Sequence, residues 1–168
     1  MLYELTVPSF IKMLGNLSLI LDKGAAYAAA KKVDMSVLLN TRLAPDQFSL
    51  IRQVQIATDN AKYGAARLTG KDAPKHDDTE KTLEELKARI ADVIAYLQTY
   101  KESDFADAAG RKVLLPWWKG KHLTGHEYVV QYLIPNFHFH VVTAYSILRA
   151  NGVDLGKSDY LGPLPLKD

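Results

Sequence analysis

The chain has 168 residues, and its 21 Lys and Arg residues nearly balance 19 Asp and Glu residues, for a formal net charge of +2. This length predicts a single domain, residues 1–168, and an apolar share of 48% is typical of a globular protein. Cysteine is absent, which excludes disulfide frameworks, zinc knuckles, iron–sulfur clusters and thiol nucleophiles. Because no basic cluster exceeds Lys31-Lys32, we expect no nucleic-acid partner.

The start of the chain does not have the pattern of a secretion signal, since Glu4, Pro8 and Lys12 interrupt it, so we expect a cytoplasmic protein. The segment 128–148 has the length of a membrane span and no formal charge. It carries several polar or helix-disrupting residues: Gln131, Pro135, Asn136, His138, His140, Thr143 and Ser146. This content indicates a buried helix of a soluble protein, and we expect no membrane partner.

Apolar residues recur at helical spacing in four long stretches. We expect helices over 8–31, 46–69, 79–101 and 124–149. Pro8 suits a first helical turn, while Asp77 with Glu80 and Thr124 with Glu127 have the spacing of capping boxes. The sequence therefore predicts an all-α four-helix bundle.

The connections are expected to be irregular. Residues 34–39 predict a short helical turn, 71–78 a polar loop, and 102–123 an irregular excursion compatible with a short hairpin. Pro135 should kink the fourth helix, because it removes a backbone hydrogen bond. An irregular C-terminal tail, 153–168, should pack over the bundle.

Three short motifs point only weakly to chemistry. Gly156-Lys157-Ser158 resembles the end of a phosphate-binding loop, but it lacks the preceding strand and the first glycine of that motif. His122 and His126 have metal-ligand spacing, yet the expected cap leaves the first outside the helix, which favours a surface pair. His138 and His140 lie about 200° apart on a helix and cannot share one metal ion.

Trp117 and Trp118 follow a proline in the irregular excursion. Adjacent aromatic residues in a loop are typical of a packed plug or an interface anchor, and less often of a lid over a ligand.

The more informative pattern is polar residues within apolar helices. Gln55 and Asp59 are four residues apart in the second long helix, as are Asn136 and His140 in the fourth, so each pair lies on one face. If the two faces meet, four hydrogen-bonding groups converge in the bundle. Such a cluster is either a satisfied network that fixes helix register or a functional pocket.

Several motifs resemble an uncharacterised bacterial family of the DinB-like superfamily, over essentially the whole chain. These are the segments 52–57 (RQVQIA), 135–140 (PNFHFH), 144–149 (AYSILR) and 156–162 (GKSDYLG). The resemblance implies a DinB-like four-helix bundle that is commonly dimeric. It also implies that active members hold a divalent metal with one His on the second helix and a His-x-x-x-His pair on the fourth.

Laid on this chain, those ligand positions fall near Gln55 and on Asn136 and His140, so only one of three imidazoles is present. Neutral amides bind first-row metals much more weakly than imidazole. We therefore expect neither a metal nor another cofactor.

The leading hypothesis is a cytoplasmic, homodimeric DinB-like bundle that binds a small molecule or a partner through Gln55, Asp59, Asn136 and His140. The alternative is an enzyme, such as the thiol-dependent transferases or isomerases that the resemblance implies. In it His140 would act as general base or acid, oriented by Asp59. A third hypothesis is a purely structural dimer without a pocket.

Overall fold

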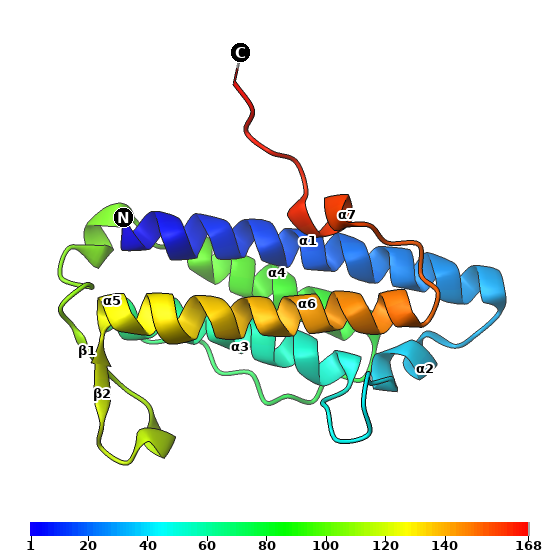
Figure 1. The fold of residues 1–168 in the computed structure, drawn as a ribbon, viewed down its shortest axis with the longest axis horizontal. Helices are drawn as coiled ribbons and strands as arrows, with labels where there is room; N and C mark the ends of the chain where they lie inside the picture. Colours follow the sequence, from blue (N-terminus) through cyan, green and yellow to red (C-terminus); the bar gives the residue numbers. More distant parts are fainter. Residues whose placement is uncertain (168) are drawn as a thin grey trace.

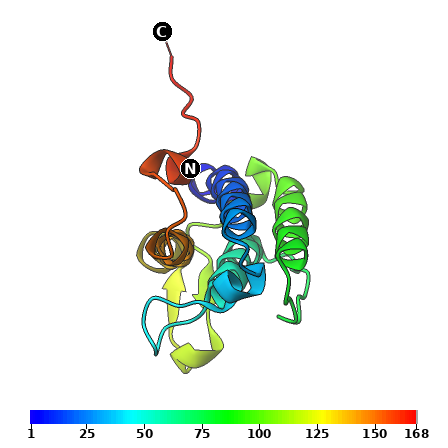
Figure 2. The ribbon, with the colours of Figure 1, turned by 90° about the vertical axis from the view of Figure 1, so that its right-hand side faces the viewer.

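The computed structural model describes residues 1–167, and the predicted all-α four-helix bundle is confirmed. Its long helices are α1 (Leu2–Lys31), α3 (Leu50–Thr69), α4 (Leu83–Gln98) and a nearly continuous fourth rod. The rod consists of α5 (Gly125–Tyr128), the π-helical turn η3 (Val129–Leu133) and α6 (Ile134–Ala150). Figures 1 and 2 show α1 and α3 as a central pair, flanked by α4 on one side and α6 on the other.

Shorter elements occupy the connections. They are α2 (Met35–Asn40), the 3-10 turns η1 (Glu102–Phe105) and η2 (Pro116–Trp118), the strands β1 (Lys112–Leu114) and β2 (His122–Thr124), and α7 (Lys157–Leu161). The strands form an antiparallel hairpin in which Val113 faces Leu123, so the expected excursion contains a hairpin. The C-terminal tail is not wholly irregular, because Gly156 caps α7 and Ser158 lies in its first turn. Beyond α7 the chain projects away from the bundle (Figure 1).

Two helix starts differ from the predictions. The first helix begins at Leu2 rather than at residue 8, with Pro8 inside it. Burial of Leu2 and Val7 favours these turns enough to outweigh the hydrogen bond that the proline removes. The second long helix begins at Leu50 rather than at 46, because 41–49 form a loop closed by the Leu50 N–H bond to the Thr41 carbonyl, 2.9 Å long.

The third long helix also begins later, at Leu83 rather than 79. Its capping box is formed by Thr82 and Glu85, not by Asp77 and Glu80. The Glu80 carboxylate accepts hydrogen bonds from Arg89 instead and is not free to cap a helix. The box at the start of the fourth rod is where the sequence predicts it.

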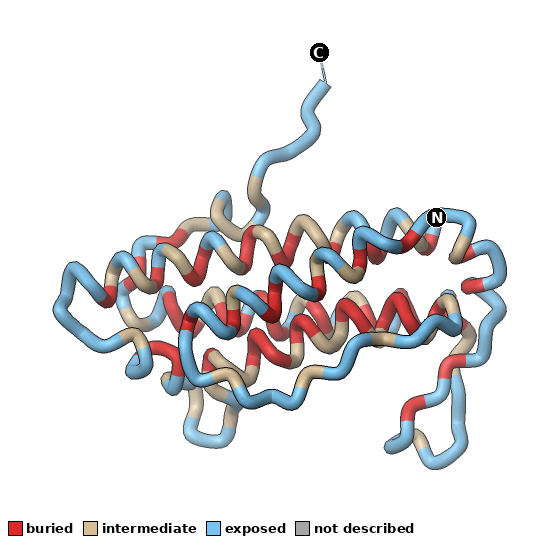
Figure 3. The backbone as a smooth tube through the Cα atoms, turned by 180° about the vertical axis from the view of Figure 1, so that it is seen from behind, coloured by how far each residue is buried: buried red, intermediate tan, exposed pale blue. Residues whose placement is uncertain are grey.

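The core fills the space between the four rods, as the burial pattern in Figure 3 shows. A close approach of α3 and η3 depends on Gly64, because a β-carbon there would lie 2.6 Å from the Leu133 side chain. In η3 the Ile134 N–H bonds to the carbonyl of Val129, five residues back. This wider turn directly precedes Pro135, and such turns are frequent at functional sites.

By length and composition, α1 is the one described helix that could cross a bilayer. Half of its most apolar window is buried inside the bundle. One such helix is weak evidence for a membrane span, because the core helix of a soluble protein passes the same test.

Candidate functional site

The predicted site residues Gln55 and Asp59 of α3 face α4, where they meet a buried arginine. Arg89 has a side chain only 1% exposed. Its Nη2 donates to a carboxylate oxygen of Asp59 at 2.7 Å and to the Gln55 carbonyl at 3.3 Å. The Gln55 side chain donates to Glu80 at 2.9 Å.

The remaining donors of Arg89 are also satisfied. Its Nε bonds to the Thr58 hydroxyl at 2.8 Å, and its Nη1 bonds to Asp78 at 2.7 Å and Glu80 at 3.0 Å. The guanidinium thus has a partner for each of its five N–H groups. We call these residues, namely Gln55, Thr58, Asp59, Asp78, Glu80 and Arg89, the Arg89 network.

The Arg89 network holds the loop between α3 and α4 against both helices. Burial would raise the pKa of Asp78, but hydrogen bonds from Arg52 and Arg89 outweigh it, and the pKa is lowered. Lys62, whose side chain is fully buried, pairs with Asp59 at 2.9 Å and contacts Nδ1 of His76 at 2.6 Å. The loop therefore carries charges that the two helices neutralise.

The other two predicted residues, Asn136 and His140 of α6, face the opposite side of α3. The Asn136 amide donates to Asn60 Oδ1 at 3.1 Å. His140 Nδ1 lies 2.7 Å from Gln53 Oε1. Gln53 Nε2 donates in turn to the Phe48 carbonyl at 3.1 Å, which fixes this amide so that its oxygen faces the imidazole.

The predicted convergence of all four residues is therefore wrong: Asp59 and Asn136 line one cleft, described below, but Gln55 and His140 do not line it, and no hydrogen bond within residues 1–167 links the α3 pair to the α6 pair. The partners of the α6 pair are Gln53 and Asn60. Gln53 is two residues from Gln55, or about 200° around the helix, and Asn60 is one residue from Asp59, or about 100°. The sequence contains a spacing that could have identified these partners, because Gln53 and Asn60 are seven residues apart and share a face of the helix. Asp59 does not orient His140.

The contacts of His140 define its tautomer. Because Gln53 Oε1 can only accept, Nδ1 carries the proton, and Nε2 makes no hydrogen bond to residues 1–167. Burial, with a smaller contribution from Arg52, lowers its pKa to about 4. The imidazole is therefore neutral at pH 7.

A cleft of about 330 Å³ opens between α3 and η3–α6, on the Asn136 side of α3. Six residues of α3 line its floor: Arg52, Ile56, Asp59, Asn60, Tyr63 and Arg67. Tyr132 of η3, Asn136 of α6 and Trp117 of the hairpin complete the lining. Asp59 and Asn136 thus meet here as lining residues, whereas Gln55 and His140 do not line the cleft.

The two tryptophans play different parts. Trp118 packs edge-on against Tyr132, with ring centroids 5.3 Å apart, as the predicted plug would. Trp117 lines the cleft and is 60% exposed, as a lid residue would be.

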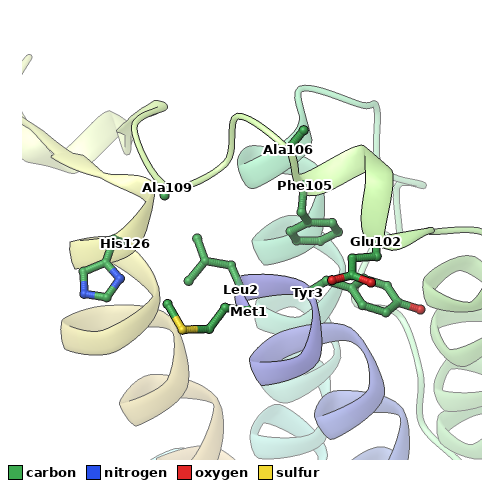
Figure 4. Close-up of a pocket in the computed structure, with 8 residues that line it drawn as sticks. All are labelled: Met1, Leu2, Tyr3, Glu102, Phe105, Ala106, Ala109 and His126. Atoms are coloured by element: carbon green, nitrogen blue, oxygen red, sulfur yellow. The ribbon is translucent and has the colours of Figure 1, made fainter.

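A second hollow, of about 310 Å³, lies at one end of the bundle (Figure 4). Met1, Leu2 and Phe105 supply much of its lining, and His126 and Glu102 lie at opposite sides of it (Figure 4). Neither of these two side chains is oriented by a hydrogen bond within residues 1–167. The α3–α6 cleft has the better-ordered polar groups and is the stronger candidate site.

A metal does not fit the superfamily ligand positions of this chain. Gln55 and Asn136 offer neutral amides, and both are engaged with other side chains. Over residues 1–167, no three His, Asp or Glu side chains gather as metal ligands. His122 lies exposed in β2, and His126 lines the end hollow.

Comparisons with known proteins agree with this architecture. Residues 2–161 match the family described as "Domain of unknown function (DUF1993)". The fold is similar to the crystal structure of a DinB family member protein from Shewanella denitrificans, with 60% sequence identity and a TM-score of 0.97. That alignment covers 100% of this chain and 96% of the other. No curated protein matches the chain.

Proposed function

Because the chain belongs to the DUF1993 family and has a DinB-like fold, we propose that it is a small-molecule-binding protein whose ligand lies in the α3–α6 cleft. The chemistry of the cleft carries this proposal. Tyr63, Trp117 and Tyr132 give it aromatic surface, and Asn60 and Asn136 place amides beside that surface. Ligand sites combine mostly apolar walls with a few placed polar groups in this way.

We further propose that binding needs no metal, because the three superfamily ligand positions hold one imidazole and two amides. Protein purified without chelator should contain far less than one equivalent of zinc, nickel or iron by elemental analysis. Stoichiometric metal that survives dialysis and is released by His140→Ala would contradict this proposal.

The binding proposal is tested by a fragment screen read by ligand-observed NMR. Ile56→Trp should fill the cleft and abolish binding of the hits, because Ile56 lies in its floor. Leu5→Trp is the matched control, since it places the same ring at a 42% exposed position of α1 outside the cleft. Hits that bind both variants equally, or no hits at all, would refute a ligand site in the cleft and favour the structural-dimer hypothesis.

A proton-transfer enzyme is the second candidate, and one observation favours it: Nε2 of His140 has a free lone pair and a fixed tautomer. The low pKa makes this imidazole a weak base, and the cleft does not reach it. The enzyme would be favoured by an activity, for example thiol-dependent transfer, that is lost in His140→Gln. That activity should also decline as pH falls, with a midpoint near pH 4.

We also propose a homodimer in the cytoplasm. Large apolar side chains on α6 and its neighbouring loop support self-association: Phe48 is 56% exposed, Phe139 56% and Val142 43%. Light scattering at micromolar concentration should give twice the 18.7 kDa mass of one chain. A single 18.7 kDa particle would refute the dimer, and cell fractionation tests the compartment.

A further inference from the structure

The charged residues of the α3–α6 cleft are not equally neutralised. Asp59 pairs with Arg89 and Lys62, and Arg52 pairs with Asp78. Arg67 is different, since within residues 1–167 no carboxylate lies within ion-pair distance of it. The cleft therefore contains one arginine whose charge the described chain leaves without a counter-charge.

Arg67 is nevertheless held in place. Its guanidinium lies over the Tyr63 ring, 5.3 Å from the centroid, and its Nη1 donates to the Tyr128 hydroxyl at 3.2 Å. Burial raises the pKa of Tyr128 despite the nearby arginine, so the phenol stays neutral and leaves the charge of Arg67 intact. An oriented, partly buried cation without a counter-ion is ready to receive an anion.

A second donor belongs to Asn60, a residue that lines the same cleft. Within residues 1–167 the buried Nδ2 of Asn60 has no hydrogen-bond partner, although the oxygen of this amide accepts from Asn136. Asn60 and Arg67 are seven residues apart on α3, or roughly 10 Å along the helix. A ligand spanning them needs one acceptor at each end.

The space between these two donors has aromatic walls. Tyr132 is held by stacking on Tyr128, with centroids 5.8 Å apart, and Trp117 also lines the cleft. A flat ring therefore has surfaces to stack on, whereas a branched aliphatic body does not gain the same contact.

From this arrangement we infer that the cleft binds a small aromatic carboxylic acid, its carboxylate on Arg67 and a second acceptor on Asn60. The inference rests on the proposed function, because it specifies the ligand of the same cleft. Arginine suits this role since its planar N–H groups match a carboxylate in geometry and charge.

The test compares 4-hydroxybenzoate with 4-hydroxybenzamide, which has the same ring and hydroxyl group but no charge. Binding is followed by ligand-observed NMR and by quenching of tryptophan fluorescence, with Trp117→Phe to identify the responding ring. The acid should bind at least roughly tenfold more tightly than the amide, as expected for a charge-assisted hydrogen bond. Benzoate, which lacks the second acceptor, should bind more weakly than 4-hydroxybenzoate.

Variants separate a specific site from general attraction to a basic protein. Arg67→Gln should weaken binding of the acid much more than binding of the amide and so remove the preference for the acid, while Arg67→Lys should retain part of it. Arg42→Gln, at an exposed arginine outside the cleft, should change nothing. Circular dichroism confirms that each variant is folded.

The outcomes distinguish the ligand class from the proposed function. Equal affinity for acid and amide, or acid binding that survives Arg67→Gln, would overturn the carboxylate inference. If neither probe binds but other fragments bind in a way that Ile56→Trp blocks, the ligand class is wrong and the cleft remains a binding site. If nothing binds the cleft, both proposals fail.

Discussion

Both faces of α3 carry polar groups but use them differently. Toward α4, Arg89 donates to partners on α3 and on the following loop, and its charge is compensated by three carboxylates. Toward α6, the contacts are neutral amide and imidazole pairs, and beside them lies a cleft with Arg67, which has no ionic partner in residues 1–167. One face is a satisfied network of charges, and the other is the face on which we propose that a ligand binds.

This difference assigns different roles to residues that the sequence pattern alone treats as equivalent. A satisfied network contributes to stability and specifies how the loop packs, and its polar groups are already engaged; this holds even for Asp59, which lines the cleft but pairs with Arg89 and Lys62. Donors that are oriented yet unpaired contribute little to folding and are available for binding. Mutations on the two faces should therefore separate stability from affinity.

The largest effect is expected for Arg89→Leu. This change leaves the carboxylates of Asp59, Asp78 and Glu80 without their common partner, and breaking such a buried set costs about 3–5 kcal/mol. Urea denaturation measures the free energy of unfolding. A loss below about 1 kcal/mol would mean that the Arg89 network does not stabilise the fold.

The next effect is a pH dependence that arises from His140. Its pKa is about 4 in the folded protein and near 6.5 when unfolded, so the unfolded chain binds the proton more readily. The contribution of the neutral His140 to the free energy of unfolding is complete above pH 6.5. It is lost as pH falls toward 4, by up to about 1.4 kcal/mol per pH unit. Comparing unfolding free energies of wild type and His140→Gln at pH 7 and pH 5 should show a smaller change in the variant, and an identical change would contradict this account.

A smaller loss, about 2 kcal/mol, is expected for Asp59→Ala. The variant removes charge-assisted hydrogen bonds to Arg89 and Lys62, but Arg89 keeps Asp78 and Glu80. The double variant Asp59→Ala with Arg89→Leu should be less destabilised than the sum of the two single changes. If the two losses of unfolding free energy, measured by urea denaturation, are additive, the two residues are not coupled.

The smallest effect on stability is expected for Arg67→Leu. Because Arg67 has no ionic partner in residues 1–167, its loss should change the unfolding free energy by less than about 1 kcal/mol. The same substitution at Arg89 is the matched comparison. Equal destabilisation by the two variants would remove the distinction between the two faces.

The sequence predicts the bundle well because apolar periodicity is a property of each helix by itself. It predicts the start of the fourth rod, where Thr124 and Glu127 cap locally, but not the start of α4, where Arg89 binds the Glu80 carboxylate from another element. Burial likewise moves the start of α1 to Leu2 despite Pro8.

The site was harder to predict, because it depends on which face of each helix meets which neighbour. The spacing correctly puts Gln55 and Asp59 on one face of their helix, and Asn136 and His140 on one face of theirs. It does not reveal that α3 turns the first pair toward α4. Arg67 carried no sequence signal of its own. Its importance depends on Tyr63, Tyr128 and the absence of a carboxylate nearby, which only the assembled fold defines.

The most direct test of the central claim is to map ligand-induced chemical shifts in the ¹⁵N-labelled protein during titration with 4-hydroxybenzoate. The account predicts that the perturbed amides cluster at Asn60, Tyr63, Arg67, Trp117 and Tyr132, along the α6 side of α3. Amides around Arg89 should stay unchanged. Shifts centred on the Arg89 network or on the hollow beside Met1 and His126, or no shifts at all, would contradict it.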